Sequence, residues 1–226
     1  MTSFYLETLE GDEITLDEDS SRHAINVLRM KTGNELSLTD GKGQLALASI
    51  IDPHKKKTRV HIINRRFSGA SSNQVCIAIS LVKNASRFEW FLEKATEIGV
   101  NEIIPLICDR TEKDQFRHNR MLAIVVSAML QSQQSWLPTL HQPTAFKDLL
   151  LRTYSRKLIA HCLPSSPKEK LNSQGGNTLL AIGPEGDFST EEINTALANN
   201  FAAVTLGETR LRTETAGLAG AVILKF

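Results

Sequence analysis

The sequence predicts an α/β protein with a small amino-terminal β-barrel and a larger domain built on a mostly parallel sheet. In the first seventy residues, short alternating apolar and polar runs are broken by turn signals. Beyond them, apolar runs of strand length alternate with helical patterns. The small polar segment Ser68–Asn73 between these regions is typical of a linker. The expected domains are therefore residues 1–70 and 74–226.

The amino-terminal region contains four runs that suit half-buried strands, joined in part by a hairpin. Asp40–Gly43 carries the glycines of a tight turn between two of these runs. One helix is expected over Ser21–Arg29, where Ala24, Val27 and Leu28 share a face. The predicted strands are residues 13–16, 35–39, 44–48 and 59–63.

Charge in the barrel region is segregated along the chain. Residues 1–19 hold seven acids and no base, whereas residues 53–66 hold six bases and no acid. The net charge of the whole chain is only +1, so binding of nucleic acid has to rest on local patches. We interpret Lys55–Lys57 as a solvated loop tip. Contact with phosphate requires that Arg22, Arg29 and Lys31 lie on the same side.

The second region predicts buried parallel strands covered by helices. A helix is expected to start at a capping box of Ser86 and Glu89 and to end at Gly99, and another spans about residues 120–133. Because these runs are almost wholly apolar, both faces of the sheet should be covered. The predicted strands are residues 75–82, 103–108, 158–162, 178–182 and 202–206.

Composition excludes several classes of protein. The cysteines Cys76, Cys108 and Cys162 are far apart and form no CxxC pair, so we expect neither a disulfide framework nor a metal site. Acidic residues interrupt any apolar run near Met1, and no stretch reaches the roughly 20 apolar residues of a membrane span. These features predict a reduced, soluble, cytoplasmic protein.

Two glycine-bearing loops near the carboxyl terminus predict a binding site. Gly183–Ser189 follows one predicted strand and leads into a helix that Ser189 and Glu192 should cap. Gly207–Thr215 follows the next strand and leads into a small-residue helix over 216–224. Ligands of open parallel sheets bind beyond the carboxyl ends of the strands. We expect these two strands to be neighbours, so that their loops share one pocket.

The loops also restrict the ligand. Neither reads GxGxxG, and no GxxxxGK[ST] is present, so a dinucleotide site and a phosphate-binding P-loop are disfavoured. A pocket lined mainly by backbone and without a metal fits a cofactor that contains a nucleoside.

These motifs resemble the ribosomal RNA small subunit methyltransferase E family of the knotted SPOUT methyltransferases. The resemblance is carried by Ile182–Ser189, by Leu206–Ala216, by Lys94–Val100 and by the His23–Gly33 segment, and it extends over essentially the whole chain. It implies a PUA-like, RNA-binding barrel joined to an α/β domain with a deep trefoil knot. It also implies a homodimer that uses S-adenosyl-L-methionine to methylate N3 of a 16S rRNA uridine near the decoding centre, in rRNA processing and ribosome biogenesis.

The resemblance implies the cofactor contacts, whereas the catalytic and RNA-binding roles follow from the chemistry of methyl transfer and from the positions of the side chains. Arg212 is expected to stabilise the negative charge of the uracil, and Glu185 to act as the base, with Glu214 as the alternative base. Expected RNA contacts are Arg22, His23, Arg29 and Arg110, although Arg110 could equally form an ion pair with Glu112 or Asp114. The expected cofactor contacts are His161, Leu163, Ile182, Gly183, Pro184, Glu185, Gly186, Leu206, Gly207, Leu211, Arg212 and Thr215.

Three positions depart from the family pattern. Leu130 and Gln134 replace a glutamate and an arginine, which puts an RNA or dimer contact in doubt, and Asp187 replaces a glycine beside the cofactor. Two other functions remain open at this point: a related knotted methyltransferase acting on tRNA or on a ribose hydroxyl, and a non-catalytic RNA-binding or ribosome-assembly factor with a vestigial pocket.

Overall fold

A computed structural model describes residues 2–163 and 167–226, which group into two compact units. The first unit comprises the chain up to Ala70 together with Met129–Leu137, and the second comprises Ser71–Ala128 and Pro138–Phe226. The returning segment is held in the first unit by backbone hydrogen bonds to the Asp40–Gly43 turn. Gly43 N–H donates to the Ser135 carbonyl over 2.8 Å, and Leu137 N–H donates to the Gly41 carbonyl over the same distance.

The first unit is built on a five-stranded sheet in the order β1-β3-β4-β5-β2. The Asp40–Gly43 turn joins β3 and β4 as an antiparallel pair, which confirms the predicted hairpin. The short strand β1 was not expected, and it pairs in parallel with β3. Alternate residues of β4, such as Ala46, Ala48 and Ile50, form the core. The strands are β1 (Ser3–Tyr5), β2 (Glu13–Thr15), β3 (Glu35–Thr39), β4 (Gln44–Asp52) and β5 (Arg59–Phe67).

The helix of the first unit differs from the predicted one. Helix α1 (Glu18–Arg22) begins three residues earlier, because the Asp17 side chain accepts a hydrogen bond from Ser20 N–H and caps it. It continues as one π-helical segment, His23–Val27, and the chain leaves through Arg29 at a left-handed φ of 55°.

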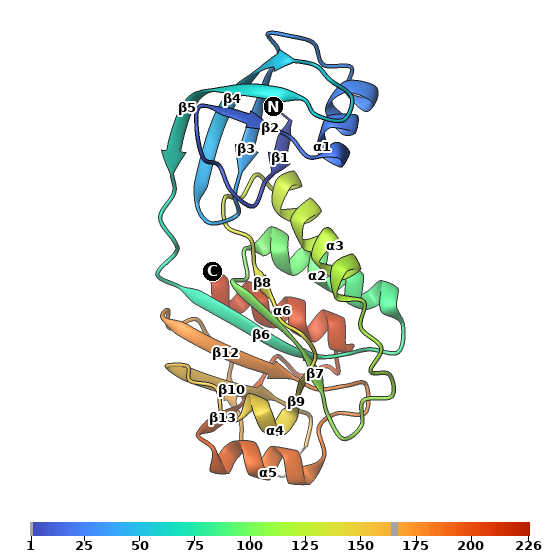
Figure 1. Cartoon of the computed structure of the whole chain (residues 1–226). Helices are drawn as coiled ribbons and strands as arrows, with labels where there is room; N and C mark the ends of the chain where they lie inside the picture. Colours follow the sequence, from blue (N-terminus) through green and yellow to red (C-terminus); the bar gives the residue numbers. More distant parts are fainter. Residues whose placement is uncertain (1, 164–166) are drawn as a thin grey trace. The chain divides into compact units, whose positions relative to one another are not determined.

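The second unit contains an eight-stranded sheet in which every pair is parallel, as the apolar runs predicted. The order along the main path is β11-β13-β10-β12-β6-β7-β8, with β9 paired to β7, and Figure 1 labels all of these strands except β11. The strands are β6 (Gln74–Ser80), β7 (Glu102–Ile107), β8 (Thr139–Leu140), β9 (Thr144–Ala145), β10 (Arg156–Ala160), β11 (Glu169–Lys170), β12 (Asn177–Ile182) and β13 (Phe201–Thr205).

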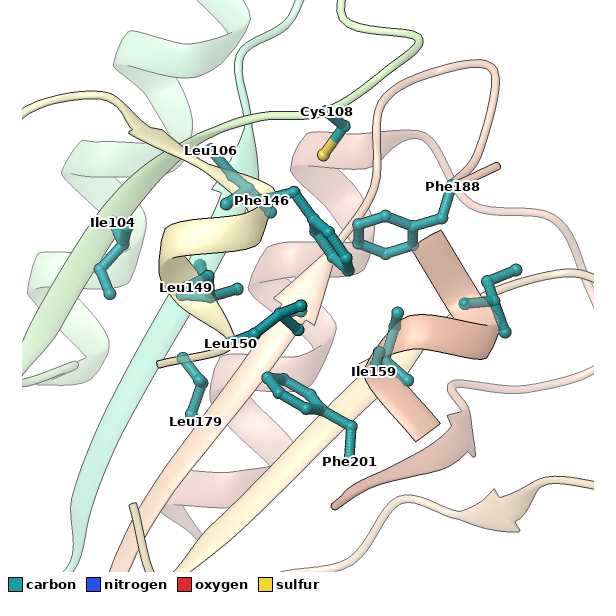
Figure 2. Packing of buried hydrophobic residues seen from close by; sticks show 14 of the residues in the cluster. Ile104, Leu106, Cys108, Phe146, Leu149, Leu150, Ile159, Leu179, Phe188 and Phe201 are labelled. Atoms are coloured by element: carbon teal, nitrogen blue, oxygen red, sulfur yellow. The ribbon is translucent and has the colours of Figure 1, made fainter. Parts of the chain in front are cut away.

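Helices cover both faces of this sheet. On one face, helix α6 (Thr213–Lys225) lies against β6, β12 and helix α2 (Ala85–Ile98). On the other, α4 (Phe146–Leu149) and α5 (Thr190–Ala198) close a cluster that Figure 2 shows in detail. There the Phe146 ring packs on Phe188, with ring centroids 5.4 Å apart. Phe188 belongs to the loop after β12, so the core fixes that loop directly.

Local signals at helix ends were partly right. The capping box of Ser189 and Glu192 at α5 is confirmed, and Gly99 ends α2 at a φ of 86°. The predicted capping box at α2 is wrong, because Asn84 caps the helix and its side chain accepts from Ser86 N–H. Glu89 instead binds the guanidinium of Arg120.

The remaining long helices lie close to their predicted positions. Helix α3 (His118–Gln131) is displaced by two residues from the expected range, and α6 begins at Thr213 rather than at residue 216. Of the helices that the structure describes, none is long and apolar enough to span a bilayer.

Candidate functional site

Three loops meet at the carboxyl edge of the parallel sheet. The predicted pair of loops follows β12 and β13, but these strands are not neighbours, because β10 lies between them. The expectation of adjacent strands is therefore wrong in detail. Because β10 lies between the two strands, the loop after β10, which starts at His161, enters the same site. Adjacency could not be read from the sequence, since chain order does not determine strand order.

A cavity of about 320 Å³ lies between these loops, within the range of roughly 300–1,000 Å³ that is typical of small-molecule sites. Three of the predicted cofactor contacts do not line it. Leu163 and Gly186 line an adjoining cavity together with Arg110, and Thr215 is exposed on α6. Residues 164–166 of the loop after β10 lie outside the described residues. The predicted contacts that line the main cavity are His161, Ile182, Gly183, Pro184, Glu185, Leu206, Gly207, Leu211 and Arg212.

Hydrogen bonds join the three loops to one another. The Asp187 carboxylate accepts from Cys162 N–H over 2.7 Å and from Phe188 N–H over 2.8 Å, which connects the loops after β10 and β12. Thr213 Oγ1 donates to the Gly183 carbonyl over 3.1 Å, which connects the loop after β12 to the start of α6. The walls of the cavity are therefore mutually braced.

The loop after β12 is also held by residues that follow strands β6 and β7. Lys83 N–H, just beyond β6, donates to Glu185 Oε1, and Arg110, just beyond β7, donates to the Gly186 carbonyl over 2.7 Å. Arg210 Nη2 donates to the Glu185 carbonyl over 3.3 Å. These bonds hold the backbone of Gly183–Glu185 in place at the cavity wall.

Gly207 makes the sharp turn after β13. Its φ is 142°, in the region that side-chain-bearing residues rarely adopt. The turn is closed by Thr205, whose hydroxyl donates to the Gly207 carbonyl and accepts from Gly207 N–H. A glycine is therefore required at this position by the backbone itself.

His161 forms a buried polar part of the cavity wall. Its side chain is 6% exposed, and its Nδ1 accepts from Leu163 N–H over 3.2 Å. Burial lowers the pKa of the imidazole, and the nearby Lys168 ammonium lowers it further. The ring is therefore neutral with its proton on Nε2, and that atom has no partner among the residues that the structure describes.

The predicted catalytic residues differ in their surroundings. Arg212 is the N-cap residue of α6, its side chain is exposed, and it lines the cavity. Glu185 lines the same cavity. Glu214 is buried at 7% exposure and faces Arg87, with 3.7 Å between Oε1 and Nε. It is not among the residues that line the cavity, so the geometry favours Glu185 over Glu214 as a group that can reach a ligand there.

The predicted RNA contacts fall in both units. In the first unit, Arg22 pairs with Glu18, the exposed His23 contacts the Phe4 ring edge to face, and Arg29 is exposed. In the second unit, the alternative ion pair of Arg110 with Glu112 or Asp114 does not form, because Arg110 binds backbone carbonyls. Glu112 pairs with Lys83 instead. Within residues 2–163 and 167–226, no three His, Cys, Asp or Glu side chains are placed to hold a metal.

Three residues of the site were not anticipated as functional. Arg210 lies in the loop that contains Arg212, and Asp187 and Thr213 make the bonds between loops. The left-handed φ of 64° at Asp187 explains why a small or flexible residue is needed there. The sequence signal for Asp187 was its departure from glycine, but its partner Cys162 is distant along the chain.

Comparison with known proteins agrees with this architecture. Residues 70–225 match the family described as RNA methyltransferase domain, and residues 16–63 match the RNA methyltransferase PUA domain. Ribosomal RNA small subunit methyltransferase E of Mesomycoplasma hyopneumoniae is 30% identical over 203 residues, which cover 86% of each chain.

Solved structures agree over nearly the whole chain. A probable rRNA-methyltransferase from Porphyromonas gingivalis superimposes with a TM-score of 0.90 at 34% identity, covering 98% of this chain and 95% of that one. The methyltransferase E of Neisseria gonorrhoeae, solved with S-adenosyl methionine bound, gives 0.87 at 29% identity over the same shares. The chain therefore belongs to the ribosomal RNA small subunit methyltransferase E family of RNA methyltransferases.

Proposed function

We propose that this protein transfers a methyl group from S-adenosyl-L-methionine to N3 of a uridine in the RNA of the small ribosomal subunit. The observation that carries the proposal is the braced cavity of three loops at the carboxyl edge of the sheet, in a chain whose solved relative binds S-adenosyl methionine. Its residues fit such a cofactor, because the cavity is of small-molecule size, has Gly183 and Gly207 among its lining residues, and has in its wall the Nε2–H of His161, which has no partner among the described residues.

The chemistry divides between orientation and charge. When bound, the cofactor supplies a methyl group from a sulfonium, whose sulfur leaves as a neutral thioether in line with the attacking nitrogen. Holding the reactants in this alignment is therefore a large part of catalysis. Uracil N3 carries a proton that must leave before or during transfer, and the ring then bears negative charge on its oxygens. In the proposal, Arg212 faces that charge from the mouth of the cavity, and the Glu185 carboxylate accepts the proton.

The geometry favours Arg212 for this role over its neighbour. Arg210 is engaged with the Glu185 carbonyl, whereas the Arg212 side chain forms no hydrogen bond or ion pair with any described residue. A free guanidinium can meet a developing anion without first giving up a partner. Glu185 has one carboxylate oxygen on the Lys83 amide, which leaves the other available.

The decisive experiment is transfer of label. The protein is incubated with labelled S-adenosyl-L-methionine and small subunits that lack the modification, and the label is mapped on the RNA. Label on uracil N3 supports the proposal. Label on a ribose supports the related knotted methyltransferases instead, and no transfer indicates a non-catalytic RNA-binding or assembly factor.

Substitution of Arg212 tests its role within the same assay. Arg212→Ala should abolish transfer while cofactor affinity falls much less, because the guanidinium acts on the uracil. Equal loss of both would reassign Arg212 to the cofactor. The matched control is Arg156→Ala, which removes an arginine at the amino end of β10, the opposite edge of the sheet, and should retain transfer.

The trefoil knot and the homodimer are part of the same proposal, and both rest on the family resemblance. Sedimentation velocity at several protein concentrations tests the dimer directly. A monomer at all concentrations that still transfers label would remove the dimer from the proposal while leaving the chemistry in place.

A further inference from the structure

A groove lies beside the carboxyl half of β5 in the first unit. Three adjoining cavities, of about 530, 250 and 70 Å³, share Leu45 and Arg66 as wall residues. We call this surface the outer groove and define it by Ser37, Leu45, Arg66, Phe67, Gln133 and Trp136. It lies wholly within one unit, since Gln133 and Trp136 belong to the segment that returns to the barrel.

The strand register places Arg66 and Ser37 on the face of the sheet that points away from the core. Arg66 lies opposite Leu45 on β4, and Ser37 lies opposite Leu47, so these side chains point away from the core. Strand β2 pairs only with residues 59–61 of β5. The carboxyl end of β5, which carries Arg66 and Phe67, therefore has a strand neighbour on one side only among the described residues.

The groove is cationic without opposing acid. None of the described residues that line its three cavities is Asp or Glu, although the chain has 25 acids in all. Other arginines of β5 are engaged, Arg59 with Glu13 and Arg65 with the Gly11 carbonyl. The Arg66 side chain has no hydrogen bond or ion pair with any described residue. Its guanidinium is therefore free to meet an anion that enters the groove.

Two aromatic rings stand at one end of the groove. Phe67 is 68% exposed, and its ring meets Trp136 edge to face with centroids 6.2 Å apart. The Trp136 indole N–H is occupied by the Ser68 carbonyl at 2.9 Å, so the rings offer faces and edges rather than a donor. Gly43, at a φ of 97°, makes room for them, because a Cβ there would lie 2.8 Å from Trp136 and 2.9 Å from Phe67.

We propose that the outer groove binds single-stranded RNA, with a base stacked at Phe67 and Trp136 and a phosphate at Arg66. Stacking platforms beside a positive groove are the general means by which proteins hold unpaired nucleotides. Polar amide and hydroxyl groups such as those of Gln133 and Ser37 can contact base edges and sugars. A second protein copy fits less well, because the buried centre of a homodimer interface is predominantly apolar and this groove has an unpaired arginine at its middle.

The proposal deepens the proposed function, on which it rests for the nature of the ligand, yet its test needs neither cofactor nor methyl transfer. The probe is a fluorescein-labelled oligouridylate of about 15 nucleotides, long enough to track one binding groove. Its affinity for the full-length protein is measured by anisotropy at several salt concentrations. Loss of methyl transfer with intact oligouridylate binding would overturn the proposed function alone.

Phe67→Ala and Arg66→Ala are the test variants, and both alter exposed side chains. Phe67→Ala should weaken binding by about fivefold or more, since a stacked base contributes strongly to affinity. Arg66→Ala should weaken binding and lower the salt slope by about 0.7, the value for one phosphate contact on a single strand. The matched control Arg59→Ala removes a paired arginine of the same strand and should change affinity less than twofold.

Tryptophan fluorescence gives a second readout. The chain has two tryptophans, so Trp90→Phe leaves Trp136 as the sole reporter, and bound oligouridylate should quench it. The proposal is overturned if both test variants bind like the control and Trp136 is not quenched. It is also overturned if the variants change the sedimentation coefficient without changing RNA affinity, which would assign the groove to a protein partner.

Discussion

Asp187 offers the most direct test of how the cofactor cavity is held together. Its carboxylate accepts from the amide of Cys162 on one loop and from the amide of Phe188 on its own. Its backbone φ is 64°, which glycine adopts freely and most other residues adopt at a cost. Substitution to glycine and to alanine therefore separates the side-chain tether from the backbone conformation.

The magnitudes follow from these two effects. A hydrogen bond to a charged group contributes about 1.5–3 kcal/mol, and the lower end applies here because Cys162 is exposed. The left-handed conformation costs alanine about 1 kcal/mol relative to glycine. Asp187→Ala should therefore lower the free energy of unfolding by about 2 kcal/mol, and Asp187→Gly by about 1 kcal/mol or less. Both variants lose the tether, so both should bind cofactor about tenfold more weakly, the equivalent of 1.4 kcal/mol.

Isothermal titration with S-adenosyl-L-methionine and urea unfolding measure the two quantities separately. The control is Asp114→Ala, an exposed aspartate that does not line the cavity, which should change neither. Binding within twofold of the wild type in both Asp187 variants would refute the tether. Weak binding in the alanine variant alone would place the effect in the backbone conformation instead.

Three other predictions concern the second unit. A thiol reagent should label the exposed Cys162 rapidly and the other two cysteines only on unfolding, because Cys76 and Cys108 are buried and burial raises the pKa of both thiols. Bound cofactor should protect Cys162 from the reagent, since Cys162 lines the cavity. Because the pKa of His161 is lowered below its ordinary 6.5 on folding, the unfolded chain binds the proton first, and stability should decline as the pH falls below 6.5. His161→Gln should remove that part of the decline in melting temperatures measured over about pH 5–8. Gly220→Val should lower the urea midpoint by the equivalent of about 1–3 kcal/mol, because a Cβ there would lie 2.3 Å from a leucine methyl of β12.

Each of these has a clear contrary result. A second rapidly labelled thiol, or a Cys162 that cofactor leaves equally reactive, would contradict the described burial and cavity. A His161→Gln variant with the same pH profile as the wild type would show that other groups cause the decline. An unchanged urea midpoint in Gly220→Val would mean that α6 does not pack on the sheet as closely as described.

Signals confined to a few consecutive residues were the easiest to interpret from the sequence. The capping box at Ser189 and Glu192, the glycine end of α2 at Gly99 and the β3–β4 turn are all set by hydrogen bonds between near neighbours. The wrong prediction of the α2 cap also concerned residues that are close neighbours in the sequence. Asn84 competed with Ser86 for the same cap, and two candidates that lie two positions apart cannot be ranked by pattern alone.

The site contains contacts between distant segments that local sequence signals did not predict. The glycine-bearing turns after β12 and β13 were visible as motifs, and both line the cavity. The insertion of β10 between those strands was not visible, nor were the bonds from Asp187 to Cys162 and from Thr213 to Gly183. The partners in each bond are separated by 25 or 30 positions, so their contact depends on strand order.

The sequence by itself determined most of the longer elements, the parallel character of the second sheet, the two loops that line the cavity and the family to which the chain belongs. Periodicity, capping and motif spacing are local properties, so they can be interpreted without knowledge of the fold. Only the tertiary structure decided which loops meet, that Glu185 rather than Glu214 lines the cavity, and that Arg66, Phe67 and Trp136 share one groove. Those results depend on strand register and packing between distant segments, which no short window of sequence contains.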